Sequence, residues 1–421
     1  MKKRKARILV SFLAVLLVSV SACKNPFLKK MLVEEEKGES SAVPKHTVTF
    51  SVEGGHGTLK AKADGVEETA KSPISIEQGK KVTFTAEPAA PYVVKEWKVD
   101  GIVVTGNTEN SYIHTVTKAV DVKVSFDAPF VEGGASLILS PNKLVISVKA
   151  VTSDGSAVAV EGCTETELTS GTVTVLHAKG TRVILKGKIT ALGCDNNQLT
   201  ALNVQGLTAL QGLDCHINQL TALNVQGLTA LQGLDCLGNQ LTELNVQGLT
   251  ALQYLSCAGN RLTALNVQGL TALKELWCYG NQLTALNVQG LTALRRLSCG
   301  GNQLTALNVQ GLNDLQTLQC DGNQFETLDA HGLRALKSLS CKNNKLSALN
   351  VQGCISLQTL VCYGNLLAAL NVQGLISLQN LRCFDNRLTV LSLQGCTALE
   401  SLECNDNRLT ALNVQGLSNL E

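Results

Sequence analysis

Cysteine and histidine are the residues of this 421-residue sequence with the most chemical potential, and their spacing decides which chemistry is possible. In the C-terminal half a cysteine recurs every 21 residues, and an asparagine follows each one three residues later. The row comprises Cys194, Cys215, Cys236, Cys257, Cys278, Cys299, Cys320, Cys341, Cys362, Cys383 and Cys404. Zinc sites need close ligand pairs such as CxxC or CxH, which this interval does not supply. We therefore expect no metal site.

The cysteine row could instead form disulfides or fill an apolar interior. If each 21-residue unit is one coil of a stack, neighbouring cysteines lie about 4.8 Å apart, which is within disulfide range. However, side chains on in-register parallel strands point the same way, and eleven cysteines cannot all pair. Cys354 and Cys396 are two units apart, about 10 Å, and are too far from each other to bridge. The sequence favours reduced, buried thiols that act as small apolar side chains.

An enzyme is not expected from the remaining reactive side chains. The histidines lie far apart in the sequence, and no nucleophile motif or phosphate-binding loop accompanies them. They are His46, His56, His114, His177, His216 and His331. A formal net charge of +2 gives no field that would attract nucleic acid. We expect a binding protein without catalytic residues or cofactors.

The repeated unit itself, LxxLxCxxNxLTxLNVQGLxx, indicates how the chain is folded. Leu213 and Cys215 are two residues apart, so on a strand both point inward, while Gly212, Asp214 and His216 point outward. Asn218 then turns the chain, and its amide can bond backbone groups that the turn leaves unpaired. Each unit therefore predicts one short parallel strand and one asparagine of a ladder.

This unit resembles the LxxLxLxxNxL signature of leucine-rich repeats with cysteine in place of one leucine, a variant similar to that of internalin J-like proteins and of leucine-rich lipoproteins from oral anaerobes and spirochaetes. The resemblance covers residues 189–421 and implies a β-rich, curved solenoid of about eleven coils with short parallel strands on its concave face. It also implies a surface protein that binds other proteins.

Residues 46–127 show the alternation of half-buried strands, as in Val48, Phe50 and Val52. Turn residues at 54–57, 64–65, 78–79 and 100–101 are typical of connections between antiparallel strands. The segment resembles the divergent B-repeat module of internalins, which implies a small all-β spacer domain. Tyr92 and Trp97 could bind a ligand, but in so small a module we expect them in its core. Residues 128–188 are expected to cap the solenoid.

The N-terminus is typical of a secretion signal, because five positive charges in residues 1–7 precede an apolar run of 13 residues. Val20-Ser21-Ala22-Cys23 resembles the lipobox of bacterial lipoproteins. The resemblance implies that residues 1–22 are removed, that Cys23 carries lipid and that residues 23–45 form a tether; an ordinary signal peptide is the alternative. We expect a lipid-anchored protein of the cell envelope, on the outer membrane and facing the exterior, with no other membrane contact.

Specificity is expected at the outward strand positions, because these vary while the rest of the unit repeats. Two groups combine aromatic side chains with arginine, the composition of binding hot spots. The first comprises Tyr254, Glu275, Trp277, Tyr279, Arg295 and Arg296, and the second Tyr363, Arg382 and Phe384. We predict adhesion to a protein of the host matrix, a host receptor or other bacteria. The alternatives are a carbohydrate-binding solenoid and a structural coat or periplasmic scaffold without a specific ligand.

Overall fold

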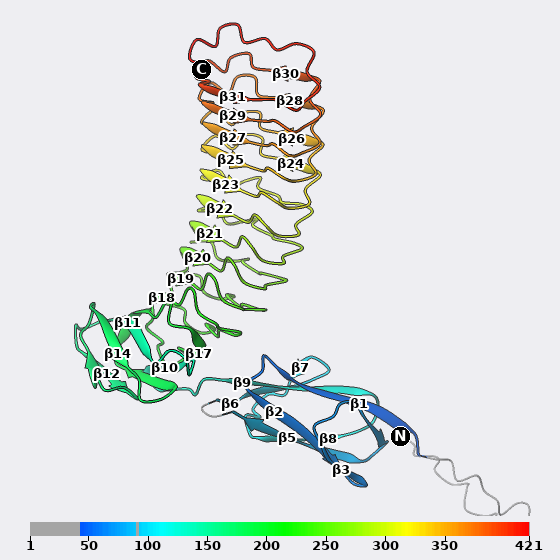
Figure 1. Cartoon of the computed structure of the whole chain (residues 1–421), viewed down its shortest axis with the longest axis vertical. Coiled ribbons are helices and arrows are strands. Elements are labelled where there is room, and N and C mark those ends of the chain that lie inside the picture. The colour runs from blue at the N-terminus through cyan, green and yellow to red at the C-terminus, as the bar shows by residue number, and fades with distance from the viewer. Residues whose placement is uncertain (1–42, 90–91, 421) are drawn as a thin grey trace, which may run out of the picture.

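The computed structural model describes residues 43–89 and 92–420. The expected signal peptide, lipidated Cys23 and almost all of the tether lie outside the described residues. Figure 1 shows a small β module near the N-terminus, a second β region, and a long stack of coils that ends at the C-terminus. No helix within the described residues has the length and apolar character needed to cross a membrane. The predicted β-rich solenoid preceded by a small all-β module is confirmed.

Two sheets form the N-terminal module. One has the strand order β4-β1-β9-β6-β7 and the other β3-β2-β5-β8. Their bounds are β1 Lys45–Glu53, β2 Gly57–Ala63, β3 Val66–Thr69, β4 Ile74–Glu77, β5 Lys81–Pro88, β6 Val93–Val99, β7 Ile102–Val103, β8 Ser111–Thr115 and β9 Val120–Asp127. Alternate residues of β1, β5 and β9 fill the space between the sheets, as the apolar alternation predicted.

The antiparallel connections predicted from the turn residues are only half right. Residues 64–65 join β2 to β3 and residues 100–101 join β6 to β7, and both pairs are antiparallel neighbours. The turns at 54–57 and 78–79 instead carry the chain from one sheet to the other, and β1 pairs with β9 in parallel. Glycine and aspartate allow the chain to reverse, but they do not determine which strand it then bonds.

Trp97 and Tyr92, both expected in the core, have different surroundings. Trp97 is fully buried and its Nε1 donates to the Glu109 carbonyl at 2.9 Å. Tyr92 is only partly buried: its ring stacks on His56 with centroids 4.1 Å apart, and its hydroxyl lies 2.6 Å from the Thr200 Oγ1. The core assignment is confirmed for Trp97, whereas Tyr92 also links the module to the start of the solenoid.

The segment between the module and the repeats covers the first coil. It contains β10 Gly134–Leu139, β11 Val145–Thr152, β12 Val158–Glu161, β13 Glu167–Leu168, β14 Val173–His177 and β15 Arg182–Lys186. β11 pairs antiparallel with β16 (Ile189–Gly193), and β10 pairs antiparallel with β17 (Leu199–Asn203). One continuous apolar core runs from Ala135 in this segment to Leu399 near the end of the stack. The open interior of the first coil is therefore shielded from water.

The repeats add one short parallel strand per coil, always in the same register, 21 residues from its neighbour. These strands are β18 Gly212–Asp214, β19 Gly233–Asp235, β20 Tyr254–Ser256, β21 Glu275–Trp277, β22 Arg296–Ser298, β23 Thr317–Gln319, β25 Ser338–Ser340, β27 Thr359–Val361, β29 Asn380–Arg382 and β31 Ser401–Glu403. Short strands also pair along the opposite edge of the stack in Figure 1: β24 Thr327–Asp329 with β26 Ala348–Asn350, and β28 Ala369–Asn371 with β30 Val390–Ser392.

The predicted asparagine ladder is present along the solenoid. In one coil Asn302 donates from Nδ2 to the carbonyl oxygens of Cys278 and Cys299, each at 3.0 Å, and its Oδ1 accepts from the Leu283 N–H at 3.0 Å. The same three bonds recur around Asn281 and Asn260. Each asparagine thus bonds the backbone of its own coil and of the preceding one, so it holds the stack together.

A second amide ladder runs along the opposite side, at the glutamine of the repeated NVQG sequence. Gln289 donates from Nε2 to the carbonyl of Asn308 in the next coil at 2.9 Å, and its own N–H bonds Oδ1 of Asn287 at 3.1 Å. Gly290 follows with a φ of +83°, a conformation that glycine adopts without strain. These bonds give the near-invariant sequence a structural reason.

The cysteines of the row are free, and every one from Cys194 to Cys383 is fully buried. Burial in the apolar interior raises the pKa of Cys299 to about 12. Cys354 and Cys396, which replace a leucine of the repeat, are also buried, and their thiols donate to carbonyl oxygens of the preceding coil, each at 3.1 Å. The predicted thiol interior is confirmed.

Candidate binding face

The outward side chains of the parallel strands form one continuous surface, which we call the strand face. In each coil it presents the residue before the buried leucine, the residue between that leucine and the cysteine, and the residue after the cysteine. In the coil of β21 these are Glu275, Trp277 and Tyr279. Because the register never shifts, equivalent residues of successive coils lie side by side, about 4.8 Å apart.

Trp277 is fixed on the strand face by the preceding coil. Its ring meets that of Tyr254 edge to face, with centroids 5.7 Å apart, and Ser256, the register partner of Trp277, is fully buried. The Tyr254 hydroxyl donates to Asp235 Oδ2 at 3.3 Å, and burial raises the pKa of Tyr254 to about 12. Trp277 is thus held in place while its ring stays partly exposed.

The charged members of the first predicted group separate in the structure. Arg296 Nη1 lies 3.2 Å from Glu275 Oε1, and both residues lie on the strand face. An exposed pair of this kind contributes about 0–1 kcal/mol to stability, so the two groups remain available to a partner at little cost. Arg295 precedes β22 and is exposed, but it does not occupy an outward strand position.

A hollow of about 570 Å³ opens beside Trp277 and extends over the next two coils. Trp277 and Tyr279 form one wall, and Gln319 and Asp321 form the other. Gly300 lies between the walls without a side chain, which is why the surface is depressed there. The sequence placed Gly300, Gln319 and Asp321 at outward positions, but it did not identify them as parts of one site.

The second predicted group is fully assembled. The rings of Tyr363 and Phe384 stack with centroids 4.2 Å apart and an interplanar angle of 13°. The Arg382 guanidinium lies 5.4 Å from the Tyr363 ring centroid and 5.6 Å from that of Phe384, and Lys342 Nζ approaches Tyr363 at 5.5 Å. Arg382 also bonds Glu403 Oε2 at 3.0 Å. Two aromatic faces with adjacent cations therefore form a rigid patch.

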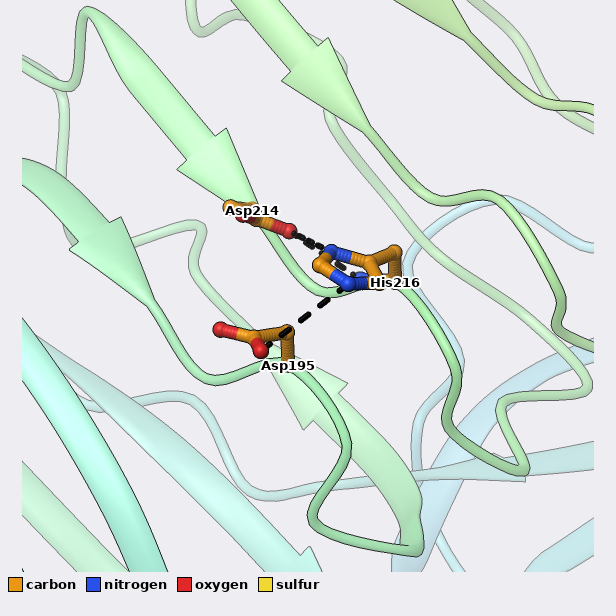
Figure 2. Close-up of side chains that lie close together, drawn as sticks. All are labelled: Asp195, Asp214 and His216. Atoms are coloured by element: carbon orange, nitrogen blue, oxygen red, sulfur yellow. Dashed lines mark hydrogen bonds and ion pairs between the residues drawn. The ribbon is translucent and has the colours of Figure 1, made fainter.

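A third cluster, at the first coils of the strand face, was not predicted as a site. Figure 2 shows His216 between two carboxylates: its Nδ1 donates to Asp214 Oδ1 at 2.5 Å, and its Nε2 lies 3.9 Å from Asp195 Oδ2. Burial alone would lower the pKa of His216, but the Asp214 hydrogen bond and the nearby negative charges raise it. Three donor atoms, one from each residue, lie within 4.8 Å of one another and are chemically suited to a divalent cation. The hydrogen bond also accounts for the pairing of Asp214 with His216 without one.

A second hollow, of about 470 Å³, lies next to this cluster. Its floor includes Gly212 and Gly233, and Asp214, Asp235 and Lys149 are among the residues around it. Lys149 belongs to β11 of the capping segment. Sequence reasoning could not find this site, because it depends on how the cap meets the first coils.

Comparison with known proteins places relatives at both parts of the chain. Residues 46–129 match the family model of the divergent InlB B-repeat domain. The functional domain of InlJ from Listeria monocytogenes, which includes a cysteine ladder, is 31% identical with a TM-score of 0.49, and the match covers 58% of this chain and 60% of that one. A leucine-rich-repeat protein of Leptospira interrogans is 31% identical (TM-score 0.43; 52% and 55% covered).

YopM, a leucine-rich effector protein from Yersinia pestis, is 27% identical with a TM-score of 0.45, and 52% of this chain and 61% of that one are covered. The chain thus spans about three fifths or less of the length of these three proteins. No curated protein matches the chain. The repeats form a leucine-rich-repeat solenoid of internalin-like type, and the module at residues 46–129 is of the bacterial repeat type.

Proposed function

We propose that this chain is a lipid-anchored surface protein that binds a protein partner through its strand face and catalyses no reaction. The observation that carries the proposal is the placement of the aromatic side chains. Trp277, Tyr279, Tyr363 and Phe384 all point outward on one face, although the solenoid has an apolar interior that could hold them. Large exposed rings beside arginine are typical of protein interfaces.

Both aromatic groups are ordered before any partner arrives. Tyr254 holds Trp277, and Arg382 lies against the stacked rings of Tyr363 and Phe384. Ordering one flexible side chain during association costs about 0.5–1.5 kcal/mol, so side chains that are already held in place retain more of their contact energy for binding. This favours a binding role over surface residues that vary without function.

The opposite side of the solenoid is poorly suited to specific recognition. Its exposed residues repeat from coil to coil, as the NVQG sequence does at Asn287 and Asn308, and their amides already bond the neighbouring coil. The strand face is where successive coils differ most. Any specificity for a partner is therefore expected there.

Competitive capture tests this function. The full chain is immobilised and exposed to extracts of host matrix and of neighbouring bacteria. We expect a retained protein to be released by excess free wild-type chain, but not by a free chain carrying Trp277→Ala, Tyr279→Ala, Tyr363→Ala and Phe384→Ala. Free chain with Thr284→Ala and Thr305→Ala, two exposed positions off the strand face, is the control and should release the protein. Equal release by all three chains would contradict binding through these rings.

The proposed anchor depends on the Cys23 thiol, which would carry the lipid. In cells that express the full chain, wild-type protein should partition into the detergent phase, whereas Cys23→Ser should leave nearly all of it in the aqueous phase, because no acyl chain is attached. Ser21→Ala keeps a small residue before the cysteine and serves as the control. If Cys23→Ser stays in the detergent phase, the anchor is elsewhere.

Exposure at the cell surface is a separate part of the proposal. A protease added to intact cells should degrade the protein while a periplasmic marker survives. Survival of the chain under these conditions would contradict an outward-facing location.

A further inference from the structure

The hollow beside Trp277 has two unlike walls that face each other across one coil. Trp277 and Tyr279 belong to one coil, Ser298 and Gly300 to the next, and Gln319 and Asp321 to the third. Coils repeat at about 4.8 Å, so the walls are about 10 Å apart, which leaves room for one six-membered ring. The volume of about 570 Å³ is that of a small-ligand pocket.

The first wall presents an aromatic surface. Trp277 is held edge to face by Tyr254, and Tyr279 is 39% exposed at the adjacent outward position. The face of an aromatic ring carries partial negative charge and attracts polarised C–H bonds. One face of a pyranose ring presents such C–H groups, so it can stack on this wall.

The second wall presents hydrogen-bonding groups in fixed positions. Asp321 Oδ1 accepts from the Ser340 hydroxyl at 2.5 Å and from the Lys342 N–H at 3.1 Å, which orients the carboxylate and leaves Oδ2 to accept from a ligand. Gln319 is exposed and offers both a donor and an acceptor. Hydroxyl groups both donate and accept, so they match this wall better than a purely apolar group or a lone cation does.

Gly300 keeps the hollow open. It lies between Tyr279 and Asp321 along the strand face, and a Cβ built on it would meet the Asp321 carbonyl oxygen at 3.0 Å. The neighbouring Gly301 has a φ of +60°, which disfavours a side chain there as well. The floor is therefore bare backbone, against which a ring can lie flat.

From this geometry we infer that the hollow binds a single pyranose residue, displayed on a glycan of the partner. The inference rests on the proposed function in that both use the strand face, and it specifies part of the partner: a glycosylated protein. Stacking on Trp277 holds the ring, and Gln319 and Asp321 select its hydroxyl pattern.

The test uses the full chain and the methyl glycosides of galactose, glucose, mannose and N-acetylglucosamine, each up to about 50 mM, above the millimolar Kd expected for one ring. The chain has two tryptophans, and Trp97 is fully buried, so a change in tryptophan fluorescence reports on Trp277. We expect at least one glycoside to give a saturable change, confirmed by saturation-transfer NMR.

Variants locate the site. Ser298→Leu fills the hollow, and a large side chain is tolerated there because Trp277 and Val361 occupy the equivalent position in other coils. It should weaken glycoside binding at least tenfold, as should Gln319→Ala, which removes one hydrogen-bonding group without adding bulk. Tyr363→Ala removes an aromatic ring from the equivalent position of a distant coil and should leave glycoside binding unchanged.

Three results would overturn the inference: no saturable signal with any of the four glycosides, undiminished binding by Ser298→Leu, or saturation of the same hollow by N-acetylarginine amide in place of a sugar. Failure of the proposed function gives a different result. A chain that binds no glycoside but still captures a protein through the strand face contradicts only the sugar site, whereas loss of competitive capture contradicts the function itself.

Discussion

Asn302→Ala should lower the free energy of unfolding of the solenoid by about 4 kcal/mol. The substitution leaves the carbonyl oxygens of Cys278 and Cys299 and the N–H of Leu283 without their partner, in a buried part of the stack. Each buried polar group left unpaired costs about 1–3 kcal/mol. Urea unfolding followed by circular dichroism measures the loss.

Asn308→Ala in the same coil is the matched control. Asn308 is exposed, and its Oδ1 accepts only the N–H of Gln310 within the described residues, at 3.0 Å. Water can replace that bond, so we expect a loss of about 1 kcal/mol or less. Fluorescence of Trp97 follows the N-terminal module and should be unchanged in both variants. Equal destabilisation by the two substitutions would contradict a structural role for the buried ladder.

Alkaline pH should unfold the solenoid before the N-terminal module. Burial raises the pKa of Cys257, Cys299 and Cys383 to about 12, above the usual value of 9.0 that an unfolded thiol has. The unfolded chain therefore releases protons that the folded chain retains, so this stabilisation is complete below pH 9 and is lost as the pH rises towards 12. Each such thiol lowers the unfolding free energy by about 1.4 kcal/mol per pH unit in this window.

The measurement is circular dichroism between pH 7 and about 12 with a reductant present. Residues 46–127 contain no cysteine, so the module is an internal control, followed through Trp97. We expect the solenoid signal to fall steeply above about pH 9 while the module persists to higher pH. Simultaneous loss of both signals, or thiols that ionise near pH 9 in an intact solenoid, would contradict the buried thiol interior.

The solenoid could be predicted from sequence because every coil repeats the same surroundings. Alternation alone placed Leu213 and Cys215 inside and Asp214 outside, and the structure agrees. Asn218 was assigned to the turn for its hydrogen-bonding capacity, and its amide does bond the backbone of two coils. A constant 21-residue interval turns a local pattern into a three-dimensional register.

Contacts between distant segments could not be read in this way. The parallel pairing of β1 with β9 and the bond from Tyr92 to Thr200 join residues far apart in the sequence, and turn chemistry is silent on both. The pairing of His216 with two aspartates depends on which way side chains of adjacent coils lean. Outward positions were predictable, whereas the depression at Gly300 required the walls on both sides to be seen together.

The strand face as the site of recognition is the central claim, and the affinity of a captured partner tests it most directly. The Kd of that partner is measured for the wild-type chain, for Trp277→Ala with Tyr279→Ala, and for the control pair Thr284→Ala with Thr305→Ala. Removing two hot-spot rings should weaken binding on the order of 100-fold or more, since each contributes about 2 kcal/mol, while the control pair stays within about twofold of wild type. A double variant at Trp277 and Tyr279 that binds with unchanged Kd would contradict the claim.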